Sequence, residues 1–384
     1  MFKKCFAGML AVMLLLLCFA CGQTAEGGTT AATKAEATEV ETNPIEGDGK
    51  IAVIVGNAEQ EPELYPTAKQ LSDAYGDTLM ILGYSPSYYA VATGLTDSAV
   101  AAARDPSVKA LVFAGGVNGT ANAAEAARRE RDDLYIIVCN PLEGTDAFKE
   151  TADLVLSVDF AALANKMVQD AKSFGAENFL FYTTDRSLKL SAIRALRTAV
   201  NDACKSAGLT SKALSCVDIY AAGKTLDMAK RYLAEDALRK AESIGKKTAL
   251  FCTEPFVQGA LAEAAAAQGM FMPASFLPSP IALADGLGLT LTGHEADSAY
   301  ALAQLQAAAK DNGTAGHVMT WSFSTPIVFL QAAVDQACAV LDGGAEATAD
   351  SVQTLVQSHT DASLTVTADG NVFLVDSTPV TLGK

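Results

Sequence analysis

The stretch VKALVFAGGVNG, Val108–Gly119, shows the pattern that decides the fold. A short run of almost entirely apolar residues is followed by a turn rich in Gly and Asn, and then by a stretch rich in Ala. An apolar run of this length, bounded by glycines, is typical of a strand buried on both faces of a parallel sheet. A crossover helix must then bring the chain back before the next parallel strand. The stretch therefore predicts one strand–turn–helix unit of an α/β protein.

The same unit repeats along the chain from Lys50 onward. A first set of apolar runs predicted as strands comprises Ile51–Val55, Thr78–Leu82, Val108–Phe113, Leu134–Cys139 and Leu154–Val158. A second set comprises Asn178–Tyr182, Ser215–Tyr220, Thr248–Phe251 and Met270–Met272. The helices predicted within the second set are Leu188–Ala207, Leu226–Ser243 and Phe256–Gln268. This alternation predicts parallel sheets with helices on both faces.

The C-terminal part of the chain is less regular. Its predicted elements are a helix His294–Asp311, a short strand Val318–Trp321, a helix Thr325–Leu341, and two strands, Ser363–Thr367 and Asn371–Val375. We expect the helix from Thr325 to return to the first set of strands, and the last two strands to cover the second set.

Two series of units predict two doubly wound lobes that join near residue 159. The first lobe is predicted to comprise residues 50–158 and about 322–350. The second is predicted to comprise residues 159–321 and about 351–384. A chain that crosses between the lobes more than once would give a multi-stranded hinge.

The N-terminal segment is predicted to be an export signal rather than part of the fold. Lys3 and Lys4 precede an apolar run, Phe6–Leu17, that is too short to span a bilayer. The C-x-x-C spacing of Cys18 and Cys21 would also fit a redox or metal pair, but the flanking residues provide no folded scaffold for one. Residues 1–20 instead resemble a bacterial lipoprotein signal, which implies lipid on Cys21.

Residues 21–49 are predicted to form a flexible tether between the lipid and the fold. They consist mainly of Ala, Thr, Glu and Gly, and so cannot bury enough apolar area to offset the entropy of ordering. The protein is then expected outside the cell membrane, held to its outer face by the lipid alone.

Composition favours a globular, acidic protein. Half of the residues are hydrophobic, 19% are charged, and the formal net charge is −16. An acidic surface disfavours nucleic acid as a partner, and we expect a monomer. Beyond Cys21, the cysteines lack metal-ligand spacing and are expected as buried apolar residues: Cys139, Cys204, Cys216, Cys252 and Cys338.

The signal, the lipidation site, the tether and the two doubly wound lobes together resemble the type I periplasmic-binding-protein family, the solute receptors of bacterial ABC importers. The chain is similar to lipoprotein branches of that family that include the basic-membrane-protein nucleoside receptors. It lacks the Asp-x-Ser-Phe-Asn stretch of those receptors and has Asn57-Ala58-Glu59-Gln60 in its place. Cytoplasmic repressors share the fold but begin with a helix-turn-helix, where this chain has the export signal.

Ligands of open parallel α/β sheets bind beyond the carboxyl ends of the strands. The loops at those ends, taken in order, give the candidate ligand-binding residues: Asn57, Glu59, Tyr84, Ser85, Gly116, Asn140, Asp159, Thr184, Asp185, Arg186, Glu254 and Trp321.

Three of these candidates have an equally simple structural alternative. Arg186 lies at a predicted helix start and could bind an anionic or hydroxyl-rich ligand, a role that the resemblance also implies, or it could pair with Asp185 on the surface. Glu254 could accept hydrogen bonds from ligand hydroxyls or cap the helix at Phe256. Trp321 could stack on a ligand or pack in the core.

No catalytic or cofactor motif is present in the sequence. Gly-Gly-Val-Asn-Gly at 115–119 lacks the Lys-Ser/Thr of a phosphate-binding loop, and His294-Glu295-Ala296-Asp297 lacks the second His of a zinc protease motif. We therefore expect neither an enzyme nor a bound metal or cofactor.

The leading hypothesis is a lipid-anchored receptor that closes its lobes on a small polar ligand, sugar-like or nucleoside-like, and delivers it to an ABC permease. The alternative is a lipoprotein in which the same closure signals to a membrane receptor or kinase. The sequence does not separate the two.

Overall fold

The computed structural model describes residues 47–59, 61–84, 93–276, 278–344 and 347–384, and these residues belong to one compact unit. The predicted signal peptide, Cys21, most of the tether and Ser85 lie outside the described residues. None of the described helices is long and apolar enough to cross a membrane.

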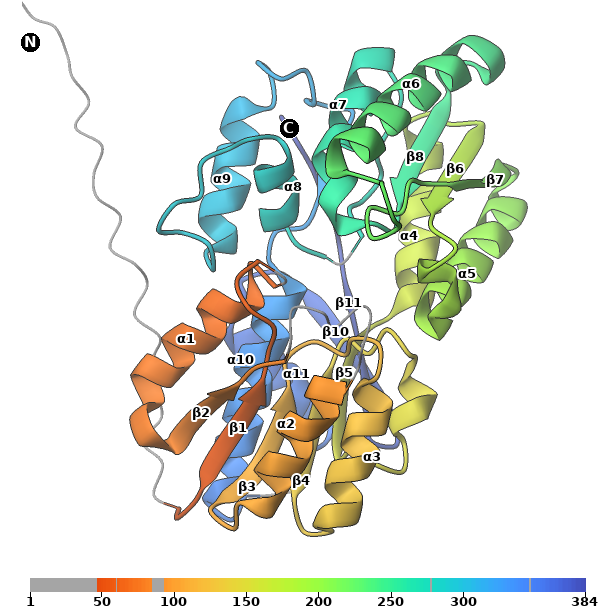
Figure 1. The fold of residues 1–384 in the computed structure, drawn as a ribbon. Coiled ribbons are helices and arrows are strands. Elements are labelled where there is room, and N and C mark those ends of the chain that lie inside the picture. The colour runs from red at the N-terminus through yellow and green to blue at the C-terminus, as the bar shows by residue number, and fades with distance from the viewer. Residues whose placement is uncertain (1–46, 60, 85–92, 277, 345–346) are drawn as a thin grey trace, which may run out of the picture. The chain divides into compact units, whose positions relative to one another are not determined.

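The first lobe is built on a seven-stranded sheet with the order β10-β11-β5-β4-β3-β1-β2 (Figure 1). Its strands are β1 (Lys50–Ile54), β2 (Leu79–Leu82), β3 (Val108–Phe113), β4 (Tyr135–Cys139), β5 (Leu154–Val158), β10 (Leu364–Asp369) and β11 (Val372–Ser377). All neighbours pair in parallel except β10 and β11, which are antiparallel. The first set of apolar runs is thus confirmed as strands.

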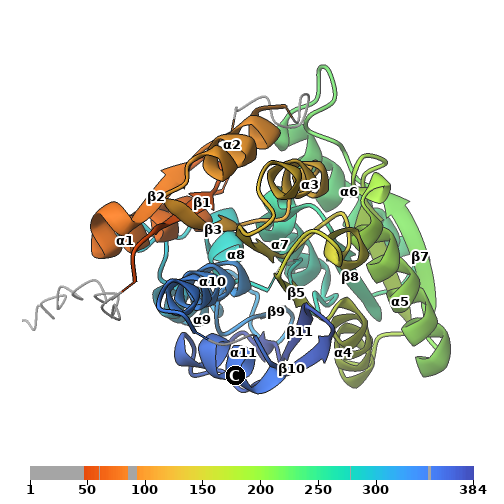
Figure 2. The same cartoon turned by 90° about the horizontal axis from the view of Figure 1, so that it is seen from below.

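Helices cover both faces of this sheet because its strands are apolar on both sides. Ile51 and Val53 belong to one buried cluster, whereas Ala52 and Ile54 belong to another, as the alternation of side chains along a strand requires. Helices α1 (Leu64–Tyr75), α10 (Thr325–Leu341) and α11 (Ala349–Ser358) pack on the first cluster, and α2 (Thr93–Arg104) and α3 (Thr120–Glu130) on the second (Figure 2). Two 3-10 turns, η1 (Gly76–Thr78) and η2 (Thr145–Phe148), complete the lobe.

The second lobe is built on a three-stranded parallel sheet with the order β7-β6-β8. Its strands are β6 (Asn178–Thr183), β7 (Thr210–Ser215) and β8 (Thr248–Cys252). Its helices are α4 (Phe160–Ser173), α5 (Ser191–Ala207), α6 (Leu226–Ile244), α7 (Gln258–Gln268), α8 (Ile281–Gly286) and α9 (Ser298–Ala308), with 3-10 turns η3 (Ser187–Lys189) and η4 (Pro255–Val257). The α4 and α5 side chains pack on one face, and α6 to α9 on the other.

Two predicted strands of the second lobe are wrong. A strand was predicted at Ser215–Tyr220. The observed strand β7 lies earlier in the chain and ends at Ser215, and residues 216–225 form a loop. The reason is that β7, TSKALS, is an edge strand whose side chains are mostly exposed, so no apolar run marks it. At 270–272 only isolated bridges form, from Phe271 to Ala249 and from Met272 to Val318.

The predicted place of the last two strands is also wrong. We expected residues 351–384 on the second lobe, but β11 pairs in parallel with β5 of the first sheet, with Val372 opposite Val155. The pairing covers the edge of β5, with Val372 buried on one face of the sheet and Phe373 and Val375 on the other.

The chain passes between the two sheets three times. It leaves the first sheet after β5, returns from β9 (Met319–Thr320) to α10, and leaves again after β11. The last crossing ends in β12 (Val380–Thr381), which pairs antiparallel with β9. The fold is therefore two doubly wound lobes joined by a multi-stranded hinge.

Helices α7 and α8 approach so closely that their contact requires glycine. A Cβ atom added to Gly259 would lie 2.0 Å from the carbonyl carbon of Gly286, a backbone atom that cannot rotate away. We predict that Gly259→Ala lowers the free energy of unfolding by about 1–3 kcal/mol, as overpacking of a core does. Urea unfolding measures this change. Gly83→Ala is the control, since a Cβ there meets nothing within 4 Å, and equal midpoints for the two variants would contradict the prediction.

Candidate functional site

The loops at the carboxyl ends of the two parallel sheets contact each other. At the start of α5, the Ala192 N–H donates a hydrogen bond to the carbonyl of Leu142 in the loop after β4. The N···O distance is 3.2 Å. The Leu142 side chain also packs against the second-lobe cluster that contains Trp321. Carboxyl ends of parallel strands are where such folds bind ligands, so the polar groups at these ends define the candidate site.

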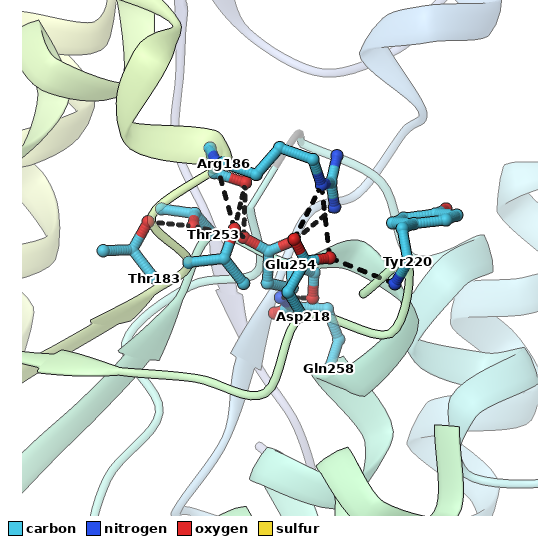
Figure 3. A network of polar contacts seen from close by, with 9 residues as sticks. Thr183, Arg186, Asp218, Tyr220, Thr253, Glu254 and Gln258 are labelled. Carbon is cyan, nitrogen blue, oxygen red and sulfur yellow. Dashed lines mark hydrogen bonds and ion pairs between the residues drawn. The ribbon is translucent and has the colours of Figure 1, made fainter. Parts of the chain in front are cut away.

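A buried carboxylate lies at the centre of the second-lobe part. Glu254 follows β8 and is 3% exposed. Its Oε1 accepts hydrogen bonds from Ser187 Oγ at 2.6 Å, Thr184 Oγ1 at 3.1 Å and Thr253 Oγ1 at 3.2 Å (Figure 3). A buried carboxylate needs such donors, because burial removes its hydration. Glu254 occupies the N-cap position of η4, but its side chain makes no capping hydrogen bond there.

Arg186 lies over this carboxylate and joins it to a second one. Its Nε donates to both carboxylate oxygens of Asp218, at 3.2 and 3.1 Å, and its Nη2 lies 3.9 Å from Glu254 Oε2. The guanidinium also stacks over the Tyr220 ring, 4.3 Å from its centroid. The partner of Arg186 is thus Asp218 rather than Asp185, which is exposed. Two carboxylates share one guanidinium, so this cluster carries a net negative charge.

The cluster extends to both sides of these residues. The Tyr220 backbone N–H donates to Asp218 Oδ1 at 3.1 Å. Gln258 Nε2 donates to the carbonyls of Cys252 and Glu254, both at 2.9 Å, while its buried Oε1 has no partner in the described part of the chain. A cavity of about 280 Å³ adjoins Asp218, and its lining residues are Ser215, Cys216, Val217, Asp218, Ala221, Lys224 and Tyr232.

A second carboxylate cluster lies in the first lobe, beyond β1 and β2. Glu61 Oε2 accepts from the Gly56 N–H at 2.6 Å, and Oε1 accepts from the Tyr84 hydroxyl at 2.9 Å. Burial raises the pKa of Glu61, and these two hydrogen bonds oppose part of the shift. The sequence pattern pointed to Tyr84 but did not indicate Glu61 as its partner.

Asn140, after β4, has an unusual backbone and side chain. Its φ is +48°, a left-handed conformation that no other non-glycine residue of the described chain adopts. Its Oδ1 is buried and has no partner among the described residues. Both features are typical of residues held in place at binding sites. Next to it, Gly116 is needed for packing, because a Cβ there would lie 2.3 Å from the Pro141 Cα.

The other sequence candidates have local roles. Asp159 caps α4 by accepting from the backbone N–H groups of Ala161 and Ala162. Asn57 Oδ1 accepts from the Glu59 N–H at 3.1 Å, and the Glu59 side chain is exposed. Trp321 is 1% exposed and donates from Nε1 to the Ser275 carbonyl, so the core alternative describes it. The structure therefore brings together Thr184, Arg186 and Glu254 and leaves these others outside that cluster.

The structure also adds residues that the sequence pattern did not single out. The predicted strand Ser215–Tyr220 includes Asp218 and Tyr220, which would then lie on one face of the sheet. In the loop after β7 they both contact Arg186. Ser187 and Glu61 each lie a few residues beyond a strand end, and only that position could have indicated them.

The fold is that of the type I periplasmic-binding-protein class. A "Putative transcriptional regulator from Clostridium difficile 630" superimposes with a TM-score of 0.72, at 16% identity over 88% of this chain and 100% of that one. A "sugar ABC transport system, substrate-binding protein" from Bordetella parapertussis 12822 superimposes with a TM-score of 0.57, at 11% identity over 90% of this chain and 92% of that one. At these identities the likeness is one of fold.

The chain belongs to the family described as "Protein of unknown function (DUF3798)", whose model matches residues 50–319. A protein of Treponema pallidum (strain Nichols), described as "Uncharacterized protein", is 26% identical over 157 residues, which is 40% of this chain and 71% of that protein.

Trp321 is the single tryptophan of the chain and provides a direct test of its burial. Because its ring is 1% exposed, acrylamide should quench its fluorescence several-fold less in the native protein than in urea. Native quenching as strong as in urea would place the ring on the surface.

The raised pKa of Glu61 predicts a pH-dependent stability. The folded protein holds this proton more tightly than the unfolded chain, whose pKa is near 4.5. The resulting stabilisation is therefore present below about pH 4.5 and is lost as the pH rises through the folded pKa. Because Glu61→Gln cannot ionise, the stability advantage of the wild type over Glu61→Gln should decrease as the pH rises above about 4.5. Thermal melts measure the difference, with the exposed Glu59→Gln as control; a difference independent of pH would refute the assignment.

Proposed function

We propose that this protein is an exported, lipid-anchored receptor that binds one small, neutral, hydroxyl-rich ligand and delivers it to an ABC importer. The observation that carries the proposal is the cluster of Glu254, Arg186 and Asp218 at the carboxyl ends of β6, β7 and β8. The export signal, the lipid on Cys21 and the tether are predictions from the sequence, and they support the anchored location.

The cluster suits a ligand that both donates and accepts hydrogen bonds. At 3.9 Å, the contact of Arg186 with Glu254 Oε2 is longer than a hydrogen bond, so this oxygen can accept one from a ligand hydroxyl. The guanidinium can in turn donate to a ligand oxygen. Hydrogen bonds to charged groups are the stronger ones, so they would orient a polyol or a nucleoside sugar.

Charge in the cluster disfavours an anionic ligand. Asp218 and Glu254 already neutralise Arg186, and a phosphate or carboxylate would face both of them. The Tyr220 ring, whose residue is 47% exposed, offers an apolar face on which a sugar or base could pack. Neutral sugars and nucleosides therefore fit better than their phosphates.

Hinge closure would couple binding to delivery. We assign the first lobe to residues 50–158, 324–358 and 364–377, and the second to residues 160–320 and 380–381, with three crossings between them. A ligand that contacts both lobes favours the closed state only by its higher affinity for that state. The permease would then recognise the closed receptor. Similarity of fold to a sugar ABC substrate-binding protein supports this role.

A sensing role is the second candidate. The neighbour with a TM-score of 0.72 is described as a transcriptional regulator rather than as a transport protein. In a sensing lipoprotein the same closure would signal to a membrane receptor or kinase. Both roles begin with ligand binding, and loss of ligand uptake in cells lacking the protein would separate transport from sensing.

Ligand binding is tested first by thermal melts of the purified protein with D-galactose, D-ribose, L-rhamnose, adenosine, uridine and D-glucose 6-phosphate. A ligand that binds only the native state raises the melting temperature through RT ln(1 + [L]/Kd). We expect a rise with at least one neutral compound and none with the phosphate. A rise with the phosphate alone would contradict the proposed charge preference.

The cluster is tested by calorimetric titration of variants with the neutral compound that gives the rise. Glu254→Gln and Arg186→Ala should each weaken binding by about 10- to 100-fold, since each removes a charge-assisted contact of about 1.5–3 kcal/mol. Asp185→Ala, which changes the exposed neighbour of Arg186, should leave Kd unchanged. Unchanged affinity in Glu254→Gln and Arg186→Ala would place the ligand elsewhere.

A further inference from the structure

A further carboxylate, Glu63, has hydrogen-bond partners other than those of Glu61 and Glu254. It stands at the start of α1 and is 9% exposed. Its Oε2 accepts hydrogen bonds from Ser324 Oγ at 2.5 Å and from Ser279 Oγ at 2.7 Å. Burial raises the pKa of Glu63, and hydrogen bonding by Ser324, Ser279 and the Ala282 backbone opposes part of this rise. We call Glu63, Ser279 and Ser324 the hinge carboxylate cluster.

Both serines lie near the start of a helix, Ser324 at the N-cap of α10 and Ser279 one residue before the N-cap of α8. Ser324 is the N-cap of α10, where its Oγ accepts from the Ile327 N–H at 3.4 Å. Ser279 precedes α8, and its Oγ accepts from the Ile281 N–H at 3.1 Å. Each hydroxyl thus accepts a hydrogen bond from a backbone N–H and donates a hydrogen bond to Glu63. Short O–H···O⁻ bonds of this kind are among the stronger hydrogen bonds in proteins.

These two helices belong to different lobes. Most apolar side chains of α10 pack in the first-lobe cluster with the strands β1, β3 and β4. Ile281, Leu283 and Ala284 of α8 pack in a second-lobe cluster with α7 and α9. Figure 1 shows α10 beside the first sheet, and α8 next to α7 and α9. Glu63 therefore bonds to its own lobe through Ser324 and to the other lobe through Ser279.

The cluster also adjoins the hinge. Ser324 follows β9, from which the chain returns to the first lobe. The neighbouring Thr325 N–H donates to the Pro278 carbonyl at 2.7 Å, so the backbone joins the same two segments. Both serine side chains are buried, at 2% exposure for Ser279 and 0% for Ser324, which shields these bonds from water.

We propose that Glu63 anchors α8 of the second lobe to the first lobe through Ser279, and thereby sets how far the lobes can turn about the hinge. The bond to Ser324 holds the carboxylate in position within the first lobe. Closure on a ligand rests on the function proposed above, but the anchor itself exists without ligand. A test on the ligand-free protein therefore fails or succeeds independently of that function.

The two serines provide a matched pair of variants. Ser279→Ala removes the hydroxyl bond between the lobes, whereas Ser324→Ala removes one within the first lobe. Each also removes a hydroxyl that accepts from a backbone N–H near the start of a helix. Spin labels carried on unnatural amino acids at the exposed positions Asp73 on α1 and Glu242 on α6 report the distance between the lobes by pulsed electron paramagnetic resonance.

We expect Ser279→Ala and Glu63→Ala to broaden the interlobe distance distribution of the ligand-free protein. Ser324→Ala should keep the wild-type distribution but lower the melting temperature, as loss of a cap does. Ser279→Thr, which retains a hydroxyl, should restore the wild-type distribution. An unchanged distribution in both Ser279→Ala and Glu63→Ala would overturn the proposal, and so would equal broadening in Ser279→Ala and Ser324→Ala.

Discussion

Burial of carboxylates at the carboxyl ends of parallel strands is the constraint on which this structure depends. Glu63 and Glu254 are buried and Glu61 is half-buried, and each is held in place by N–H or O–H donors. The donors come from segments far apart in the sequence, for example Ser324 for Glu63 and Ser187 for Glu254. Satisfying the carboxylates therefore fixes the loops at the edges where the two lobes meet.

The three carboxylates differ in what surrounds them, and this difference separates their roles. Glu63 is bonded by hydroxyls from both lobes and acts on the hinge. Glu254 has hydroxyls on Oε1 and a distant guanidinium near Oε2, which leaves capacity for a ligand. In the roles proposed for Glu254 and Glu63, ligand binding and lobe movement would use the same chemistry at separate positions.

Most of the fold could be predicted from the sequence, because strands buried on both faces leave continuous apolar runs. The edge strand Thr210–Ser215 could not, since its exposed side chains leave no such run. The hairpin of β10 and β11 was predicted as strands but assigned to the wrong lobe. Its apolar residues, such as Phe373, would be buried equally well on either sheet, and only the pairing with β5 decides between them.

The candidate site was predicted only in part, for a related reason. Arg186 and Glu254 were predicted because they follow strands in the sequence. Their hydrogen-bond partners could not be predicted, because these depend on the tertiary structure. Asp218 was not predicted as a site residue because it was assigned to the strand Ser215–Tyr220. For Trp321, the sequence did not distinguish a ring packed in the core from a ring that stacks on a ligand.

A crystal structure of the protein with the neutral compound that stabilises it most would test the central claim most directly. The account predicts a ligand hydroxyl within about 3.2 Å of Glu254 Oε2, with Arg186 donating to the same ligand. A ligand bound away from this carboxylate, or one that presents an anionic group to Arg186, would contradict it.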